Sequence, residues 1–157
     1  MDKNTFGKLV LDNEVQLYRI AKAILKRDED CADAAQEAIT RAFEKLHTLK
    51  QDAYAKTWLI RILIRECYRI LEQRSKEAAF QENQSVQVSE SEDYGSLYQA
   101  LAALEPEFRI TLVLYYLEGF QIQEISAMLE IPEGTVKSRL HRGRKKLKKL
   151  LSEEERQ

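Results

Sequence analysis

Apolar residues recur every three or four positions along most of this chain, which is the spacing that predicts amphipathic helices. The clearest stripe lies in residues 31–46, where one helix face carries Ala35, Ala38, Ile39, Ala42, Phe43 and Leu46. The segment 5–25 has a similar stripe with an expected break near Asp12 and Asn13, and the segment 54–76 has another. Counting the break, these segments predict an N-terminal domain of four helices.

The second half of the chain shows the same spacing in shorter segments. Helices are expected over about 97–104, 106–118 and 122–129, and the second starts with a proline, which is tolerated in a helix's first turn. The stripe expected to form the core of that second helix is Ile110, Val113, Leu114 and Leu117. Pro132 then forces a turn, because the residue before a proline is disfavoured in helical geometry, and a last helix follows.

The middle of the chain differs in composition. Between Glu77 and Glu107 there is no Lys or Arg but there are seven acidic residues, and the centre is rich in Gln, Ser and Asn. Such a stretch buries too little apolar surface to order itself. We therefore predict an all-α protein with two small helical domains, 1–79 and 96–157, joined by a flexible acidic linker over 80–95. The C-terminal domain is expected to be a helix-turn-helix domain.

The bulk properties point to a cytoplasmic protein without a metal or a cofactor. The chain has 157 residues, and no apolar run approaches the roughly 20 residues that cross a bilayer. Its N-terminus has no signal-peptide-like apolar segment, so we do not expect it to be inserted in a membrane. Cys31 and Cys67 stand far apart with no histidine at metal-ligand spacing, and are expected to be reduced, partly buried thiols.

The last helix is strongly basic. From Glu133 to Leu150 there are eight Lys and Arg against one acid, although the whole chain has a formal net charge of -1. Its inward stripe is expected to be Val136, Leu140, Gly143, Leu147 and Leu150. The other side, which we call the recognition face, carries Thr135, Lys137, Ser138, Arg139, His141, Arg142 and Lys145.

This helix follows a tight turn, as the second half of a helix-turn-helix does. In the major groove of DNA, Ser138, His141 and Arg142 would point at base edges, while the flanking cations would contact phosphates. A merely solvated Lys-rich helix is the alternative. It explains the late lysines, but it does not explain the turn before them.

The segment 54–76 has two unlike sides. Leu59, Ile62, Leu63, Cys67, Ile70 and Leu71 are expected to pack inward. The other side, which we call the aromatic–arginine face, carries Tyr54, Trp58, Arg61, Arg65, Tyr68 and Arg69. Rings interleaved with guanidinium groups can stack unpaired bases and hold phosphates. The alternative is that Tyr54 and Trp58 pack on a neighbouring helix and the arginines pair with acids.

Two motifs resemble a known family. The first runs Glu124-Ile125-Ser126-x-x-Leu129-x-Ile131-Pro132-x-Gly134-Thr135-Val136-Lys137-Ser138-Arg139-Leu140. The second joins Asp33-x-x-Gln36-Glu37 to Thr57-Trp58-Leu59-x-Arg61-Ile62. Over about residues 14–151 the chain resembles the extracytoplasmic-function sigma factors, which are initiation subunits of bacterial RNA polymerase. The first motif is similar to their region four and the second to their region two.

The resemblance implies a role for each surface. A docking face of Asp33, Gln36, Glu37 and Arg41 would bind the clamp helices of the polymerase's largest subunit. The aromatic–arginine face would recognise and help to open the minus-10 promoter element, and the recognition face would bind the minus-35 element. Many members of the family have Asn and Asp at the positions of Arg65 and Arg69, so the minus-10 base preference does not transfer.

The resemblance also implies partners. They are core RNA polymerase, including the flap of its second-largest subunit, promoter DNA, and an anti-sigma factor anchored in the membrane. The implied function is promoter-specific initiation of transcription, in response to a stress.

Two other classes of protein are open from the residues alone. A stand-alone helix-turn-helix regulator would share the recognition face but would need no docking face. An enzyme such as a small nuclease is the other class. Its sequence should show a catalytic constellation, and we find none: His47 and His141 are the only histidines, and there is no Gly-rich phosphate loop.

Overall fold

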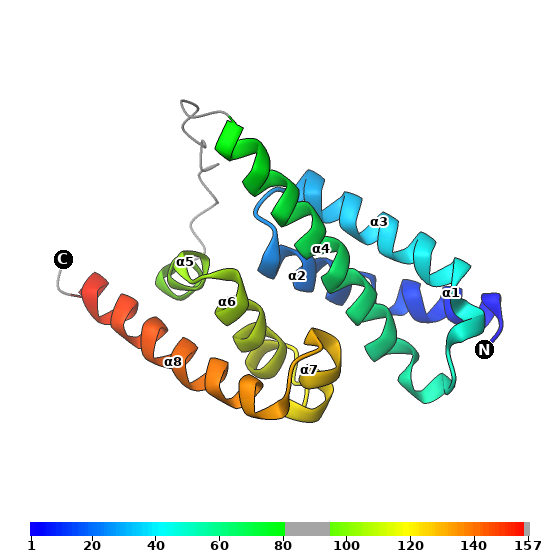
Figure 1. Cartoon of the computed structure of the whole chain (residues 1–157). Helices are drawn as coiled ribbons and strands as arrows, with labels where there is room; N and C mark the ends of the chain where they lie inside the picture. Colours follow the sequence, from blue (N-terminus) through cyan, green and yellow to red (C-terminus); the bar gives the residue numbers. More distant parts are fainter. Residues whose placement is uncertain (81–94, 156–157) are drawn as a thin grey trace.

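The computed structural model describes residues 1–80 and 95–155, and every regular element in these ranges is a helix (Figure 1). The α-helices are α1 (Lys3–Asp12), α2 (Glu14–Ile24), α3 (Asp28–Glu44), α4 (Ala55–Phe80), α5 (Gly95–Ala103), α6 (Pro106–Leu112), α7 (Ile122–Leu129) and α8 (Glu133–Glu155). Short 3-10 helices η1 (Leu46–Thr48) and η2 (Asp52–Tyr54) and a π-helix η3 (Val113–Leu117) connect them. The predicted all-α fold class is confirmed. Of the predicted linker, residues 81–94 lie outside the described residues.

The N-terminal helices pack around α4, which lies against α2 and α3 (Figure 1). The first predicted helix breaks at Asn13, whose side-chain amide donates to the backbone oxygen of Leu9 at 2.7 Å. Inward positions of α4 are confirmed, since Leu59, Ile62, Leu63 and Cys67 are buried. The expected burial of Cys31 and Cys67 is confirmed as well, and burial raises the pKa of these thiols to about 11 and about 12.

The C-terminal helices enclose a second set of buried side chains. Ile110, Leu114, Ile125, Met128 and Val136 are almost fully buried. Helix α8 passes close to α6 at Gly143, where an added Cβ would lie 3.2 Å from a methyl group of Leu112. An added Cβ at this position would therefore need the Leu112 side chain to shift by a few tenths of an ångström.

One core prediction for this domain is wrong. Leu117, expected beside Leu114, is 55% exposed. The reason is the π-helical turn of η3, which adds a residue to the turn and rotates the following side chains away from the α-helical stripe. The same region exposes Tyr115 and Tyr116, whose rings meet edge to face with centroids 4.9 Å apart.

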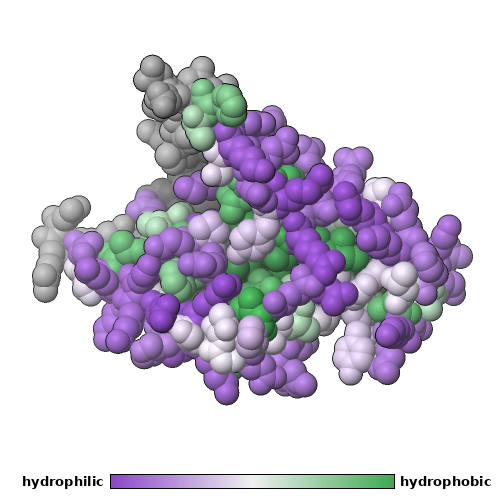
Figure 2. Space-filling model, in the orientation of Figure 1, coloured by the Kyte–Doolittle hydropathy of each residue, from purple (hydrophilic) through white to green (hydrophobic). Residues whose placement is uncertain are grey.

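The two groups of helices contact each other directly, with α6 against α2 and α7 against α4. Figure 2 shows hydrophobic side chains between α4 and the C-terminal helices, with hydrophilic side chains around them. Glu118, at the end of η3, has a side chain that is only 3% exposed and accepts from Arg19 at 2.7 Å and from Gln16 at 3.0 Å. The guanidinium of Arg19 accordingly holds the pKa of Glu118 below its usual value.

A buried arginine forms the most extensive polar contact between the two groups. Arg109 of α6 is 7% exposed and donates to backbone oxygens at the ends of two helices. Two are on α5 and just after it, Ala102 at 3.2 Å and Leu104 at 2.9 Å, and two are on α2, Ala23 and Ile24, the latter at 3.2 Å. Burial lowers the pKa of Arg109. Helix C-termini carry partial negative charge, so these carbonyls stabilise the cation without a carboxylate.

Within the described ranges, none of the helices is both long enough and apolar enough to span a bilayer.

Candidate functional site

Helices α7 and α8 meet at a tight turn that the backbone holds in one conformation. Glu130 adopts left-handed angles (φ 58°, ψ 44°), which few residues other than glycine and asparagine favour. The hydroxyl of Ser126 donates to the backbone oxygen of Ile131 at 2.5 Å. The backbone N–H of Ile131 in turn donates to the backbone oxygen of Ser126 at 3.2 Å. The first turn of α8 begins with the Val136 N–H donating to the oxygen of Pro132. This is the geometry of a helix-turn-helix.

The recognition face lies on the outer side of α8. Lys137, His141, Arg142 and Lys145 are exposed, while Thr135, Ser138 and Arg139 are half-buried. Neighbouring cations on α8 are used within the domain instead. Arg144 donates to the hydroxyl of Tyr116 at 2.7 Å, and Lys146 pairs with Glu105 at 2.8 Å and lies over the ring of Phe108. Arg144 and Lys146 are exposed too, but each also has a partner in its own domain.

The aromatic–arginine face begins at η2 and continues along α4. Tyr54 is 62% exposed, whereas Trp58 is half-buried and packs edge to face on Phe6, with ring centroids 5.9 Å apart. Arg61 is half-buried, and among the described residues its Nε is a buried donor with no hydrogen-bond partner. A buried donor without an acceptor is uncommon in a folded protein, because its desolvation is not compensated.

The later part of this face lies opposite the helix-turn-helix. Arg65 is paired with Glu130 through two contacts, and its Nε lies 2.9 Å from a carboxylate oxygen. Tyr68 is half-buried; burial raises its pKa, and the nearby charge of Arg139 acts in the opposite direction. Arg69 pairs with Glu66. A cleft of about 370 Å³ opens here between α4 and the end of α7.

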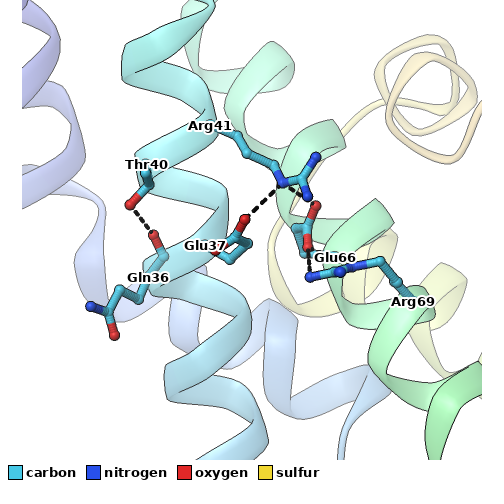
Figure 3. A network of polar contacts seen from close by, with 6 residues as sticks. All are labelled: Gln36, Glu37, Thr40, Arg41, Glu66 and Arg69. Carbon is cyan, nitrogen blue, oxygen red and sulfur yellow. Dashed lines mark hydrogen bonds and ion pairs between the residues drawn. The ribbon is translucent and has the colours of Figure 1, made fainter.

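The docking face lies on α3, and Figure 3 shows three of its four residues, Gln36, Glu37 and Arg41. Asp33 and Gln36 are exposed, and Glu37 and Arg41 are half-buried. The Nε of Arg41 lies 3.0 Å from Glu37 and 2.9 Å from Glu66 of α4. The docking face and the aromatic–arginine face thus meet at one buried carboxylate.

Three residues of these surfaces were not found from the sequence: Glu66, Arg109 and Glu130. Glu66 lies between Leu63 and Cys67 on the inward side of α4, so an acid within an apolar stripe was the available signal. Arg109 similarly interrupts the apolar residues of α6. The pairing of Glu130 with Arg65 joins residues 65 positions apart, and no periodicity reports such a contact.

Comparison with known proteins covers both groups of helices. Residues 9–77 match the family model for sigma-70 region 2, and residues 94–147 match that for sigma-70 region 4. The chain is 31% identical to the ECF RNA polymerase sigma factor SigM of Mycobacterium tuberculosis, over 96% of this chain and 79% of the relative. It is 28% identical to the ECF RNA polymerase sigma factor SigW of Bacillus subtilis, over 96% of this chain and 90% of the relative.

Solved structures agree on the fold. The sigma factor RpoE of Bartonella quintana, in complex with the anti-sigma factor NepR, superposes with a TM-score of 0.81 over 94% of this chain and 97% of its own, at 24% identity. CnrH, in complex with the cytosolic domain of CnrY, superposes with a TM-score of 0.70 over 96% of this chain and 90% of its own, at 25% identity. Together with the relatives, these matches confirm the resemblance seen in the motifs, and the chain belongs to the extracytoplasmic-function sigma factors, which direct bacterial RNA polymerase to promoters.

Proposed function

We propose that this sigma factor reads a two-part promoter with the recognition face of α8 and the aromatic–arginine face of α4, while the docking face of α3 holds core RNA polymerase. The observation that carries the proposal is the division of the cations on α8. Arg144 and Lys146 are bound within their own domain, whereas Lys137, Arg142 and Lys145 are exposed beside His141. Such an arrangement supports a helix that presents the charge of its outer side to an external anion.

At the minus-35 element the recognition face would combine two kinds of contact. Lys137, Arg139 and Lys145 would bind phosphates, which sets affinity and register. Ser138, His141 and Arg142 would approach base edges in the major groove, where an arginine can bind the O6 and N7 of guanine through two hydrogen bonds. Specificity at this element should therefore depend on the second group of residues.

Binding of a minus-35 duplex should weaken steeply with salt. If Lys137, Arg139 and Lys145, together with the exposed Lys148 and Lys149, engage about five phosphates, the slope of log affinity against log salt concentration should be near -4.5, because bound counterions are released. Titration of the full-length protein with a fluorescent duplex at several salt concentrations measures this slope. An affinity that is nearly independent of salt would contradict the assignment of these cations to phosphates.

At the minus-10 element the proposal rests on Arg61 and on the two aromatic side chains. The Nε of Arg61 is buried without a partner among the described residues, so a ligand that draws the guanidinium outward, such as a phosphate or an unpaired base, would supply the acceptor that it lacks. Tyr54 is exposed for stacking, and Trp58 is held at one edge by Phe6. Stacking on such rings contributes about 1 to 3 kcal/mol per base, which offsets the cost of taking a base out of the duplex.

The pair between Arg65 and Glu130 should compete with this DNA. Replacing Glu130 with glutamine removes the charge that holds Arg65, so the free protein should bind a single-stranded minus-10 oligonucleotide about 1.4- to five-fold more tightly, as expected for an exposed ion pair of about 0.2 to 1 kcal/mol. Fluorescence anisotropy measures the change. Glu133→Gln is the matched control, because Glu133 is an exposed acid in the first turn of α8. Equal gains in both variants would show a general charge effect and not release of Arg65.

The remaining assignments follow from the family and its relatives. We propose that residues 1–79 form the polymerase-binding and minus-10 domain and residues 96–157 the minus-35 domain, with the latter also touching the flap of the second-largest subunit. The relatives solved with NepR and CnrY support an anti-sigma factor as a further partner, one that we expect to be anchored in the membrane. The protein itself would act in the cytoplasm as an initiation factor, without catalysis of its own.

Run-off transcription tests the proposal as a whole. Full-length protein and core polymerase are incubated with a library of random promoter sequences, and the transcribed templates are sequenced. Enrichment of one motif with two separated elements is the expected result. Failure to initiate on any template in the library, with an established sigma factor active in parallel, would overturn the proposal.

A further inference from the structure

Glu66 is an acid buried between two proposed functional surfaces. It lies on the inward side of α4, and the residue is only 5% exposed. A carboxylate that leaves water at such a position is strongly unfavourable unless it is paired and hydrogen-bonded. The partners of Glu66 therefore matter more than those of an exposed acid.

Those partners are two arginines from different surfaces (Figure 3). One carboxylate oxygen lies 2.9 Å from the Nε of Arg41, which belongs to the docking face on α3. The other accepts a hydrogen bond from the Nε of Arg69, which belongs to the aromatic–arginine face, at 3.0 Å, and lies 2.8 Å from its Nη2. Each oxygen of the carboxylate thus serves a different surface.

The contact with Arg69 fixes more than the position of a charge. The Nε–H of Arg69 donates a hydrogen bond to one oxygen of Glu66, and Nη2 lies in ion-pair contact with the same oxygen, so the carboxylate holds one edge of the guanidinium. These contacts use one edge of the group and leave the edge formed by the two terminal nitrogens free of Glu66. That second edge is the one that binds two acceptors on a base or a phosphate, and the Arg69 side chain is 58% exposed.

Arg41 gives Glu66 a second counter-charge. If Glu66 had Arg69 alone, any ligand that drew Arg69 outward would leave a buried carboxylate unpaired, which is strongly destabilising. Arg41 lies 2.9 Å from the other oxygen, and although its Nε–H donates to Glu37, it keeps a cation beside the carboxylate of Glu66 while Arg69 engages a ligand. With both arginines beside Glu66, Arg69 can be oriented by the carboxylate and still bind a ligand.

We propose that Glu66 is a positioning residue for minus-10 recognition, which orients Arg69 toward one base of the opened strand while Arg41 keeps the carboxylate neutralised. This inference rests on the minus-10 role proposed for the aromatic–arginine face. It assigns base discrimination at one minus-10 position to Arg69 and makes that discrimination depend on an acid that never touches DNA.

The test compares bases within one protein preparation. Holoenzyme made with the full-length chain is titrated with single-stranded minus-10 oligonucleotides that carry each of the four bases at each position. Glu66→Gln keeps the shape of the side chain but removes its charge. We expect the preference at one position to fall about ten-fold, toward no preference, while affinity for core polymerase stays within two-fold. The ratio between bases is unaffected by a fraction of unfolded protein, so a purely structural role would not change it.

Two further variants make the result specific. Glu72→Gln removes an exposed acid from the same helix, where Glu72 pairs with Lys76 at 3.5 Å, and should leave the ratio between bases unchanged. Arg69→Lys keeps the charge but loses the two-edged guanidinium, and should abolish the preference at the same position even if Glu66→Gln does not fold.

The outcomes separate this inference from the proposed function. A wild-type holoenzyme without any minus-10 base preference would contradict the proposed function itself. A wild-type preference that survives in Glu66→Gln, or in Arg69→Lys, would overturn the role of Glu66 alone. Loss of the preference at one position in both variants, with Glu72→Gln unchanged, is the result expected.

Discussion

Replacing Arg109 with leucine should lower the free energy of unfolding by about 2 to 4 kcal/mol, because several buried carbonyl groups would lose their donor at once. The guanidinium donates hydrogen bonds to backbone oxygens at the ends of α2 and α5. Leucine can replace its volume but none of these hydrogen bonds. Urea unfolding followed by circular dichroism measures the change. We expect the helices around α2 and α6 to lose hydrogen-exchange protection first.

Arg144→Leu is the matched control for this substitution. Arg144 is exposed and donates to the exposed Tyr116 hydroxyl, so its loss should cost no more than about 0.5 kcal/mol. Arg109→Lys should give an intermediate loss, since one ammonium group cannot reach carbonyls on two helices in the geometry of the planar guanidinium. Equal stability of Arg109→Leu and Arg144→Leu would show that the buried contacts of Arg109 contribute little.

Replacing Gln36 and Glu37 together with alanine should reduce transcription by about 100-fold or more, while binding to a minus-35 duplex stays within two-fold. Loss of two central contacts at a protein interface commonly costs more than about 2.7 kcal/mol in total, which corresponds to this factor. The fold should survive the change. The contact of Gln36 with Thr40 is made by its backbone, and Arg41 keeps Glu66 when Glu37 is removed.

Two measurements check this result. Run-off transcription with core polymerase gives the loss of function, and anisotropy with a minus-35 duplex shows that the recognition face is intact. Glu44→Ala, an exposed acid in the last turn of the same helix, is the control and should transcribe normally. Full transcription by the double variant would show that the docking face does not bind the polymerase.

Helical periodicity was enough to predict most of this fold, because each helix must turn one apolar side to a core. The break at Asn13, the inward face of α4 and the turn at Pro132 all follow from residues that are close in the sequence. Leu117 is the exception. Leu117 is exposed because it ends a π-helical turn, which contains one more residue than an α-helical turn. The spacing of apolar residues does not predict where such a turn forms.

The residue types alone also indicate three surfaces and the family. The charge of α8 and its turn predicted a helix-turn-helix, and the rings and arginines of α4 marked a second surface. These signals are local, because they come from side chains repeated along one helix. The sequence alone therefore determined the helices, the family and the helices on which its candidate surfaces lie.

Only the tertiary structure decided how these surfaces are connected. It placed Glu130 on Arg65, inserted Arg109 between the ends of α2 and α5, and put Glu66 between Arg41 and Arg69. The pairs Arg65–Glu130 and Arg41–Glu66 join charges on different helices, and an ion pair depends on a separation of a few ångströms in space. Distance along the chain does not report that separation, so packing alone determined which charges stay free and which are held.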